Sequence, residues 1–255
     1  MQNITFSFQF FKALILFLFI QSNLNAQNIL IEYEMDIEPI DLTTDEAKDL
    51  SPQVLSFFKN QNRNNQYISQ FLRVLVVSNG QEFSMAYSEV MSKDGIEQSD
   101  VSLAKAAFIG ADAIYGNKKE IQIYEKRYPE FLLKEFEAEV LDWQITSEQK
   151  EIAGHTCIKA IPKFKSDEIT SKHYRLEYLW FSPGLNYVAT PSYFGTTLPG
   201  AVLGYKTGLA EVEALSVTAA KDEVEKINSK NKKIVSYKEL NDYIAKKAKE
   251  FFGRD

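Results

Sequence analysis

The chain has 255 residues, with 29 lysines and arginines against 35 aspartates and glutamates, and a formal net charge of −6. An acidic chain without a basic stripe repels phosphate backbones, so nucleic acid is not an expected partner. The single cysteine, Cys157, cannot form an intrachain disulfide. The length allows a sizeable core, and we expect the fold to depend on that core for its stability.

The first 26 residues have the layout of a secretory signal peptide. Lys12 precedes the apolar run 13–20, and the small residue Ala26 follows a polar stretch. Because this run is far shorter than the roughly 20 residues of a membrane-spanning helix, we expect export rather than a transmembrane anchor. Cleavage after Ala26 would leave 27–255 as a single exported domain. We expect it in the periplasm, with an extracellular location as the alternative.

Most of the exported part has the pattern of β-strands. From Ile31 to Ile37, apolar and acidic residues alternate, as in a half-buried strand. Asn79-Gly80 and Lys206-Thr207-Gly208 predict hairpin turns, and Tyr115-Gly116-Asn117 is interpreted as a turn between two short strands. Further strands are predicted at 74–77, 83–90, 120–124, 138–146, 156–164, 174–182, 201–205 and 209–217. Strands at this spacing, without a regular helix between each pair, favour an antiparallel sheet.

Few helices are predicted before the C-terminal region. Ser51 followed by Pro52 indicates a helix start, since serine caps a helix and proline suits its first turn. Thr43 and Glu46 are expected to cap a shorter turn just upstream. The segment 100–110 is predicted to form a short helix.

The clearest predicted helix covers about residues 236–252. Ser236 and Glu239 have the spacing of a capping box, in which each side chain accepts a hydrogen bond from the other's backbone N–H. An apolar stripe follows, made of Leu240, Tyr243, Ile244, Ala248, Phe251 and Phe252. We expect this stripe to dock on the sheet of its own domain, with a partner protein as the alternative. The predicted fold class is therefore α+β: mainly a curved antiparallel sheet, with a few short helices and a C-terminal helix packed on it.

Residues 142–204 contain both tryptophans, both histidines and the only cysteine. They hold four short motifs in order: WQIT at 143–146, IAGHTCIKA at 152–160, LWFSP at 179–183 and TLPGAV at 197–202. In order and spacing these resemble the GLPGLI family, a group of exported Bacteroidetes proteins of obscure function. The chain departs from the family pattern at Thr197, Ala201 and Val202, and at His155, so the resemblance is to a divergent member.

The resemblance implies an exported β-rich protein and assigns no chemistry. The segments 39–62 and 218–255 lie outside it, and their role stays open. Our candidates for motif or ligand-cavity residues are Trp143, His155, Cys157, Trp180, Phe181, Tyr193, Phe194, Leu198, Pro199 and Gly200.

Two Pro-Gly corners bracket the aromatic end of this region. Leu198-Pro199-Gly200-Ala201 has the pattern of a type II turn, since proline presets the first central φ and glycine supplies a positive second one. Ser182-Pro183-Gly184-Leu185 has the same pattern. Trp180 and Phe181 should point to opposite faces of their strand, as in a strand covered on both sides or one that lines a cavity.

His155 and Cys157 are two apart, so on a strand they would share a face. Three interpretations are open: a nucleophilic pair, two ligands of a metal site, or a buried structural thiol beside a surface histidine. We favour the last, because lone free cysteines are usually core residues and no CxxC or HExxH motif accompanies this one. We expect no cofactor, no metal and no catalytic residue.

We therefore expect a non-enzymatic envelope protein that binds an apolar ligand or acts as an accessory to an envelope complex. A pure protein-interaction module is the first alternative. A metal-binding or enzymatic protein that uses His155 and Cys157 is the second. The oligomeric state is not predicted.

Overall fold

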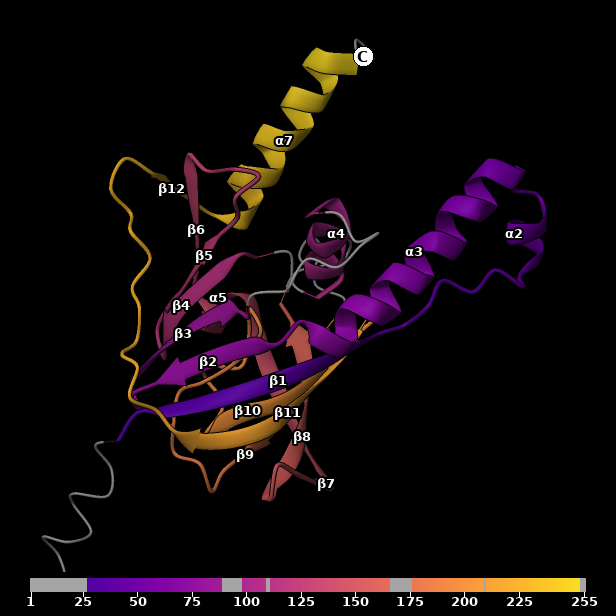
Figure 1. Ribbon diagram of the computed structural model, residues 1–255. Helices are drawn as coiled ribbons and strands as arrows, with labels where there is room; N and C mark the ends of the chain where they lie inside the picture. The colour runs from indigo at the N-terminus through magenta and orange to yellow at the C-terminus, as the bar shows by residue number, and fades with distance from the viewer. Residues whose placement is uncertain (1–26, 89–97, 109–110, 166–175, 209, 253–255) are drawn as a thin grey trace, which may run out of the picture.

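The computed structural model describes residues 27–88, 98–108, 111–165, 176–208 and 210–252. The predicted signal peptide lies outside these ranges, as do the end of the predicted strand 83–90 and the first two residues of the predicted strand 174–182. The described residues form one sheet in the order β12-β6-β5-β4-β3-β2-β1-β11-β10-β9-β8-β7 (Figure 1). Its strands are β1 (Ile29–Ile37), β2 (Val74–Ser78), β3 (Glu82–Tyr87), β4 (Ala113–Asn117), β5 (Ile121–Tyr124), β6 (Phe131–Glu135), β7 (Leu141–Ile152), β8 (His155–Phe164), β9 (Leu176–Ser182), β10 (Ala201–Thr207), β11 (Ala210–Ala219) and β12 (Lys233–Val235).

Neighbouring strands are antiparallel throughout, except that β12 runs parallel to β6. The prediction of an antiparallel-dominated α+β fold is confirmed. The sheet also curls, as one contact shows. Lys150 of β7 forms an ion pair with Glu213 of β11, although three strands lie between β7 and β11 in the sheet. Strands lie about 4.8 Å apart, so a flat sheet would hold these two side chains far from contact.

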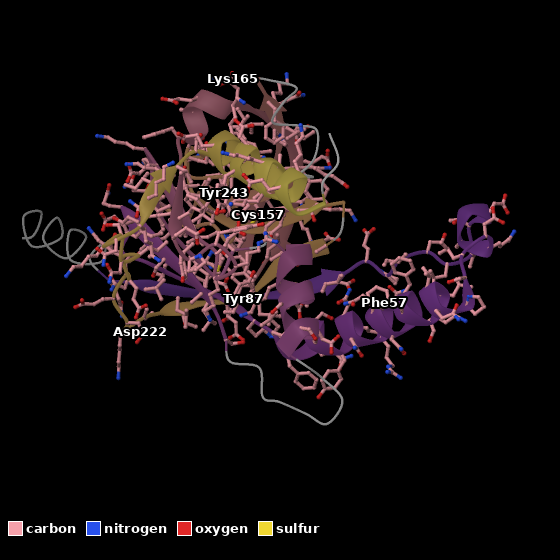
Figure 2. The ribbon with its side chains drawn as sticks, turned by 90° about the horizontal axis from the view of Figure 1, so that it is seen from above. Phe57, Tyr87, Cys157, Lys165, Asp222 and Tyr243 are labelled. Atoms are coloured by element: carbon pink, nitrogen blue, oxygen red, sulfur yellow. The ribbon has the colours of Figure 1, made fainter. Side chains whose placement is uncertain are left out.

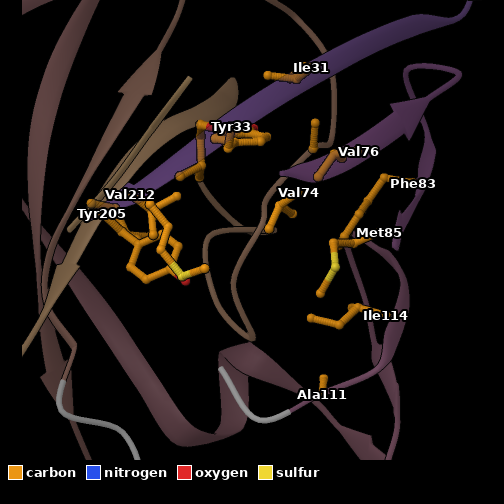
Figure 3. Packing of buried hydrophobic residues seen from close by; sticks show 14 of the residues in the cluster. Ile31, Tyr33, Val74, Val76, Phe83, Met85, Ala111, Ile114, Tyr205 and Val212 are labelled. Carbon is orange, nitrogen blue, oxygen red and sulfur yellow. Dashed lines mark hydrogen bonds between the residues drawn. The ribbon is translucent and has the colours of Figure 1, made fainter. Parts of the chain in front are cut away.

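The core lies on the inner face of the curled sheet. Every second residue of β1 is buried, with Ile31 and Tyr33 fully enclosed, as the alternation predicts. Figure 3 shows them packed with Val74, Val76 and other buried side chains of neighbouring strands. The Tyr33 hydroxyl donates to the main-chain oxygen of Val202 at 2.6 Å, which ties β1 to β10 through the interior.

The helices are α2 (Asp45–Lys48), α3 (Pro52–Phe71), α4 (Gln98–Phe108), α5 (Glu137–Val140) and α7 (Tyr237–Phe252). The Ser51 hydroxyl accepts a hydrogen bond from the Val54 N–H, which confirms the predicted start of α3. The predicted cap of α2 is wrong. Thr44 caps this helix, and the Thr43 hydroxyl instead donates to Asp41. Thr43 is held there because the Asp41 carboxylate also accepts its backbone N–H.

The predicted C-terminal capping box is confirmed. Glu239 accepts from the Ser236 N–H at 2.7 Å, and the Ser236 hydroxyl accepts from the Glu239 N–H at 3.3 Å. The first turns of α7 dock on the body through buried Leu240 and through Tyr243, whose ring lies 4.9 Å from that of Phe131 in β6. Beyond these turns the helix points away from the sheet (Figure 1).

Several local predictions differ from the structure. Gly116 lies inside β4 and not in a turn, and a Cβ on it would come within 2.6 Å of the Phe83 ring. At the β2–β3 hairpin only Gly80 takes a positive φ, of 94°, while the Asn79 side chain accepts from the N–H groups of Gln81 and Glu82. The strand predicted from 138 begins instead at Leu141, because α5 precedes it.

Candidate functional site

The two Pro-Gly corners pack directly against each other. Gly200 has a φ of 151°, and a Cβ placed on it would lie 2.1 Å from the main-chain oxygen of Ser182. Only a residue without a side chain allows this approach. The LWFSP and TLPGAV motifs, which are separate in the sequence, therefore form one corner of the molecule.

Both corners differ from the predicted type II turns. The Gly200 N–H bonds to Leu198, two residues back, which is the pattern of a γ-turn around Pro199. The Ala201 N–H bonds across to the carbonyl of Leu185, in the other corner. The Ser182–Leu185 corner does have a β-turn hydrogen bond, at 3.1 Å, but Gly184 lacks the positive φ of a type II turn. The conformation at Gly200 follows from the packing of one corner against the other, and not from the local preference for a type II turn.

A buried carboxylate fixes the loop that leads into the second corner. Glu137 of α5 is 2% exposed, and its Oε2 accepts from the Gly195 N–H at 2.9 Å and from the N–H and hydroxyl of Thr196, each at 2.7 Å. Its Oε1 accepts from the Trp143 indole N–H at 2.6 Å and from the Thr197 hydroxyl at 2.7 Å. Five donors thus converge on one side chain.

These five residues, Glu137, Trp143, Gly195, Thr196 and Thr197, form what we call the Glu137 cluster. Each carboxylate oxygen already accepts two or three hydrogen bonds, so neither offers a free lone pair for proton transfer to a substrate. The cluster joins the WQIT motif on β7 to the TLPGAV motif. Its chemistry is that of a structural anchor.

The loop between the two corners carries the candidate residues Tyr193 and Phe194, and both side chains pack against buried residues. Phe194 is buried and its ring packs edge-on against Phe164 at 5.7 Å. Tyr193 and Tyr87 are partly buried, and Tyr205 is buried. Burial raises the pKa of Tyr87 and of Tyr205, and the nearby Tyr193 adds to both shifts. The loop is also tied to the β2–β3 hairpin, since the Ser78 hydroxyl donates to Val188 at 2.7 Å.

The other candidates are divided between core and surface. Leu198 is buried and Pro199 is exposed. Phe181 is buried, whereas Trp180 lies on the opposite face of β9, where the ammonium of Lys159 sits 5.9 Å from the centre of its ring. Trp180 and Phe181 therefore lie on opposite faces, as predicted.

Cys157 is fully buried, and its thiol donates to the main-chain oxygen of His155 at 3.5 Å. Burial raises the pKa of this thiol to about 11, and the negative charge of Glu213 adds to the shift. At neutral pH the group is therefore a protonated thiol without the reactivity of a thiolate.

We expect Cys157 to react slowly with iodoacetamide in the native protein and at the rate of a free thiol once the chain is unfolded. Enclosure blocks the reagent, and the raised pKa keeps the thiolate fraction small. Mass spectrometry after timed labelling, with and without denaturant, measures both rates. Equal rates in the two states would contradict a buried thiol.

Within the described part of the chain, no three His, Cys, Asp or Glu side chains are grouped so that they could hold a metal ion. The helices described here all lack the combination of length and apolarity that a membrane crossing needs.

No protein-family model and no curated protein matches the sequence. Among solved structures, PNGF-II in a C2 crystal form is similar to this chain, with 18% identity and a TM-score of 0.46. The match covers 87% of this chain and 33% of the PNGF-II chain. PNGF-II in a P21 form matches 85% and 33%, with 17% identity and the same TM-score. The chain thus spans about a third of the length of the PNGF-II chain, and similarity of this degree says nothing about its activity.

Proposed function

We propose that the chain is an exported, non-enzymatic accessory protein of the cell envelope that binds a partner protein through helix α3. The predicted signal peptide and the resemblance to the GLPGLI family support export. The observation that carries the binding function is the outer half of α3, where Phe57 is 56% exposed on a helix that projects from the body (Figures 1 and 2).

The exposed apolar residues of α3 continue a face that the protein itself buries further along. Ile68 is fully buried at the inner end of the helix, near β1 and α4. Phe57 lies three turns earlier on the same face, and Val54 precedes it by three residues. Both are exposed. The same stripe is therefore covered at one end and uncovered at the other.

The projecting segment is held in shape by its own hydrogen bonds. Asn62 of α3 accepts from the Ile40 N–H at 2.8 Å and donates to the Ile40 oxygen at 2.9 Å, which clamps the chain after β1 to the helix. A helix that is held in place in this way and leaves an apolar stripe exposed suits an apolar groove on another protein. Val54 and Phe57 alone offer a small apolar area beside the roughly 800 Å² per partner of a stable interface, so we expect α3 to supply one part of a larger contact.

Site-specific photo-crosslinking in cells that export the protein tests this function. A crosslinking residue at Val54 should give a discrete adduct, and Phe57→Ser should remove it because the neighbouring anchor is lost. Asn60→Ser, an exposed polar position of the same helix, should leave the adduct unchanged. Both variants should keep wild-type stability within about 0.5 kcal/mol, as is usual for surface changes. The absence of any adduct, or an adduct of twice the chain's own mass, would contradict a heterologous partner.

A further inference from the structure

The connection between β11 and β12, residues 220–232, lies on the outer face of the sheet without forming a helix or strand of its own (Figure 1). We call this segment the strap. The Glu225 N–H donates to the hydroxyl of Ser84 in β3 at 3.1 Å. Ser84 stands between the core residues Phe83 and Met85, so its side chain points to the outer face of the strand. The strap therefore crosses the side of the sheet that faces away from the core.

Two lysines of the strap lie over two tyrosines of this outer face. The ammonium of Lys226 is 5.5 Å from the centre of the Tyr115 ring in β4 and 3.4 Å from the carboxylate of Glu82 in β3. The Tyr115 hydroxyl donates to the same carboxylate at 2.6 Å, which holds the ring beside the acceptor. The ammonium of Lys232 is 4.2 Å from the centre of the Tyr124 ring in β5. Because a cation is attracted to the face of an aromatic ring, each tyrosine provides a subsite for a lysine.

The subsites belong to the sheet, whereas the strap is held by weak contacts. Tyr115 is 5% exposed, on the face opposite to the core residue Ile114. The apolar residues of the strap, Ala220, Val224 and Ile227, are only half-buried. The lysine of its ion pair with β3 is exposed, and such pairs contribute little stability. Since segments with few buried apolar contacts open more easily than the core, the strap should leave its subsites while the sheet stays folded.

We propose that the outer face of β3, β4 and β5 binds a segment of a partner protein that carries two lysines six positions apart, and that the strap is an internal competitor for this site. The strap itself shows what the site accepts, since Lys226 and Lys232 have this spacing. Glu82 and the two tyrosines recognise the lysines, and Ser84 accepts a backbone N–H of the bound segment. The site is separate from the α3 surface, because its residues come from three strands of the sheet.

Fluorescence anisotropy with a labelled peptide of the strap's own sequence, residues 221–233, tests the proposal. The peptide is titrated with the exported chain, residues 27–255, as wild type and as the double variant Lys226→Gln, Lys232→Gln. The double variant loosens the strap and leaves the subsites intact, so a larger fraction of the sites is open and the apparent affinity rises. It should bind the peptide at least about threefold more tightly than wild type. Equal affinities, or no peptide binding, would overturn the proposal.

The matched control is Lys221→Gln with Lys230→Gln, which removes two exposed lysines of the strap and changes its charge by the same amount. It should change the peptide affinity by less than about twofold. An equal gain in both double variants would mean that the charge of the strap controls binding, and would exclude the two subsites. Adding Glu82→Gln to the Lys226, Lys232 variant should reverse its gain, because the first subsite loses its carboxylate. A gain that survives this change would exclude Glu82.

Hydrogen–deuterium exchange of the same chains separates release of the strap from general unfolding. The amide of Glu225, which donates to Ser84, should exchange faster in the Lys226→Gln, Lys232→Gln variant than in wild type. The amides of β1 should keep their wild-type rates. An unchanged rate at Glu225, or equal acceleration in the strap and in β1, would show that the strap is not released as a separate unit, which contradicts its role as a competitor.

Discussion

Gly200→Val is expected to destabilise the protein by about 3 kcal/mol or more. The backbone at Gly200 has a φ of 151°, which a β-branched residue adopts only with strain. A side chain there would also meet the main-chain oxygen of Ser182 at 2.1 Å, and backbone cannot turn aside as a flexible side chain can. The two corners would have to separate, and the hydrogen bond from Ala201 to Leu185 would be strained.

Gly184→Ala provides the matched control in the facing corner. A Cβ at Gly184 would have only an ordinary contact, 3.8 Å from the Ser182 hydroxyl oxygen, and its backbone is not in the positive-φ region. We expect it to change stability by less than about 0.5 kcal/mol. Urea unfolding followed by tryptophan fluorescence compares the two variants. A wild-type midpoint for Gly200→Val would show that the corners do not pack as the structure has them.

The elements that could be predicted are those whose signal is local. The capping box at Ser236 and Glu239 is closed by side chains three residues apart, and the start of α3 at Ser51 is of the same kind. The alternation in β1 reports directly which residues face the core. In these cases the residues that carry the signal also make the contact.

The predictions that failed concern contacts between distant segments. Gly116 has the composition of a turn, but it is glycine because the Phe83 ring of the neighbouring strand occupies the space of a side chain. The turn at Gly200 is set by Ser182, not by its own neighbours. β6 and β12 pair in parallel although about a hundred residues separate them, and no local sequence pattern predicts such a pair.

For the candidate site, the sequence marks the peripheral residues and misses the central one. Trp143 and the TLPGAV motif are marked by the family resemblance and by their aromatic and Pro-Gly content, and both are tied to Glu137. Nothing distinguishes Glu137 from the other acidic residues, since the chain has 35 of them and its loop partners lie 58 to 60 positions away. The only available hint is weak: an acid six residues before a tryptophan whose indole needs an acceptor.

Glu137→Ala is expected to cost about 3–5 kcal/mol of folding stability, because each buried donor left without an acceptor costs 1–3 kcal/mol. The N–H groups of Gly195 and Thr196 and the indole of Trp143 would all lose their acceptor. Glu137→Gln should cost less than alanine but remain destabilising, since it keeps one oxygen and turns an amide NH₂ toward donors.

Glu139→Ala is the matched control, because Glu139 lies in the same helix turn and is exposed. It removes one negative charge from α5, as Glu137→Ala does, so any effect of net charge or of the helix terminus is shared by the two variants. We expect its unfolding midpoint to stay near that of the wild type. Comparable losses in both variants would mean that Glu137 acts through its charge. A loss confined to Glu137 would show that the five hydrogen bonds hold the two motifs together, and that the aromatic loop depends on a carboxylate outside the motifs.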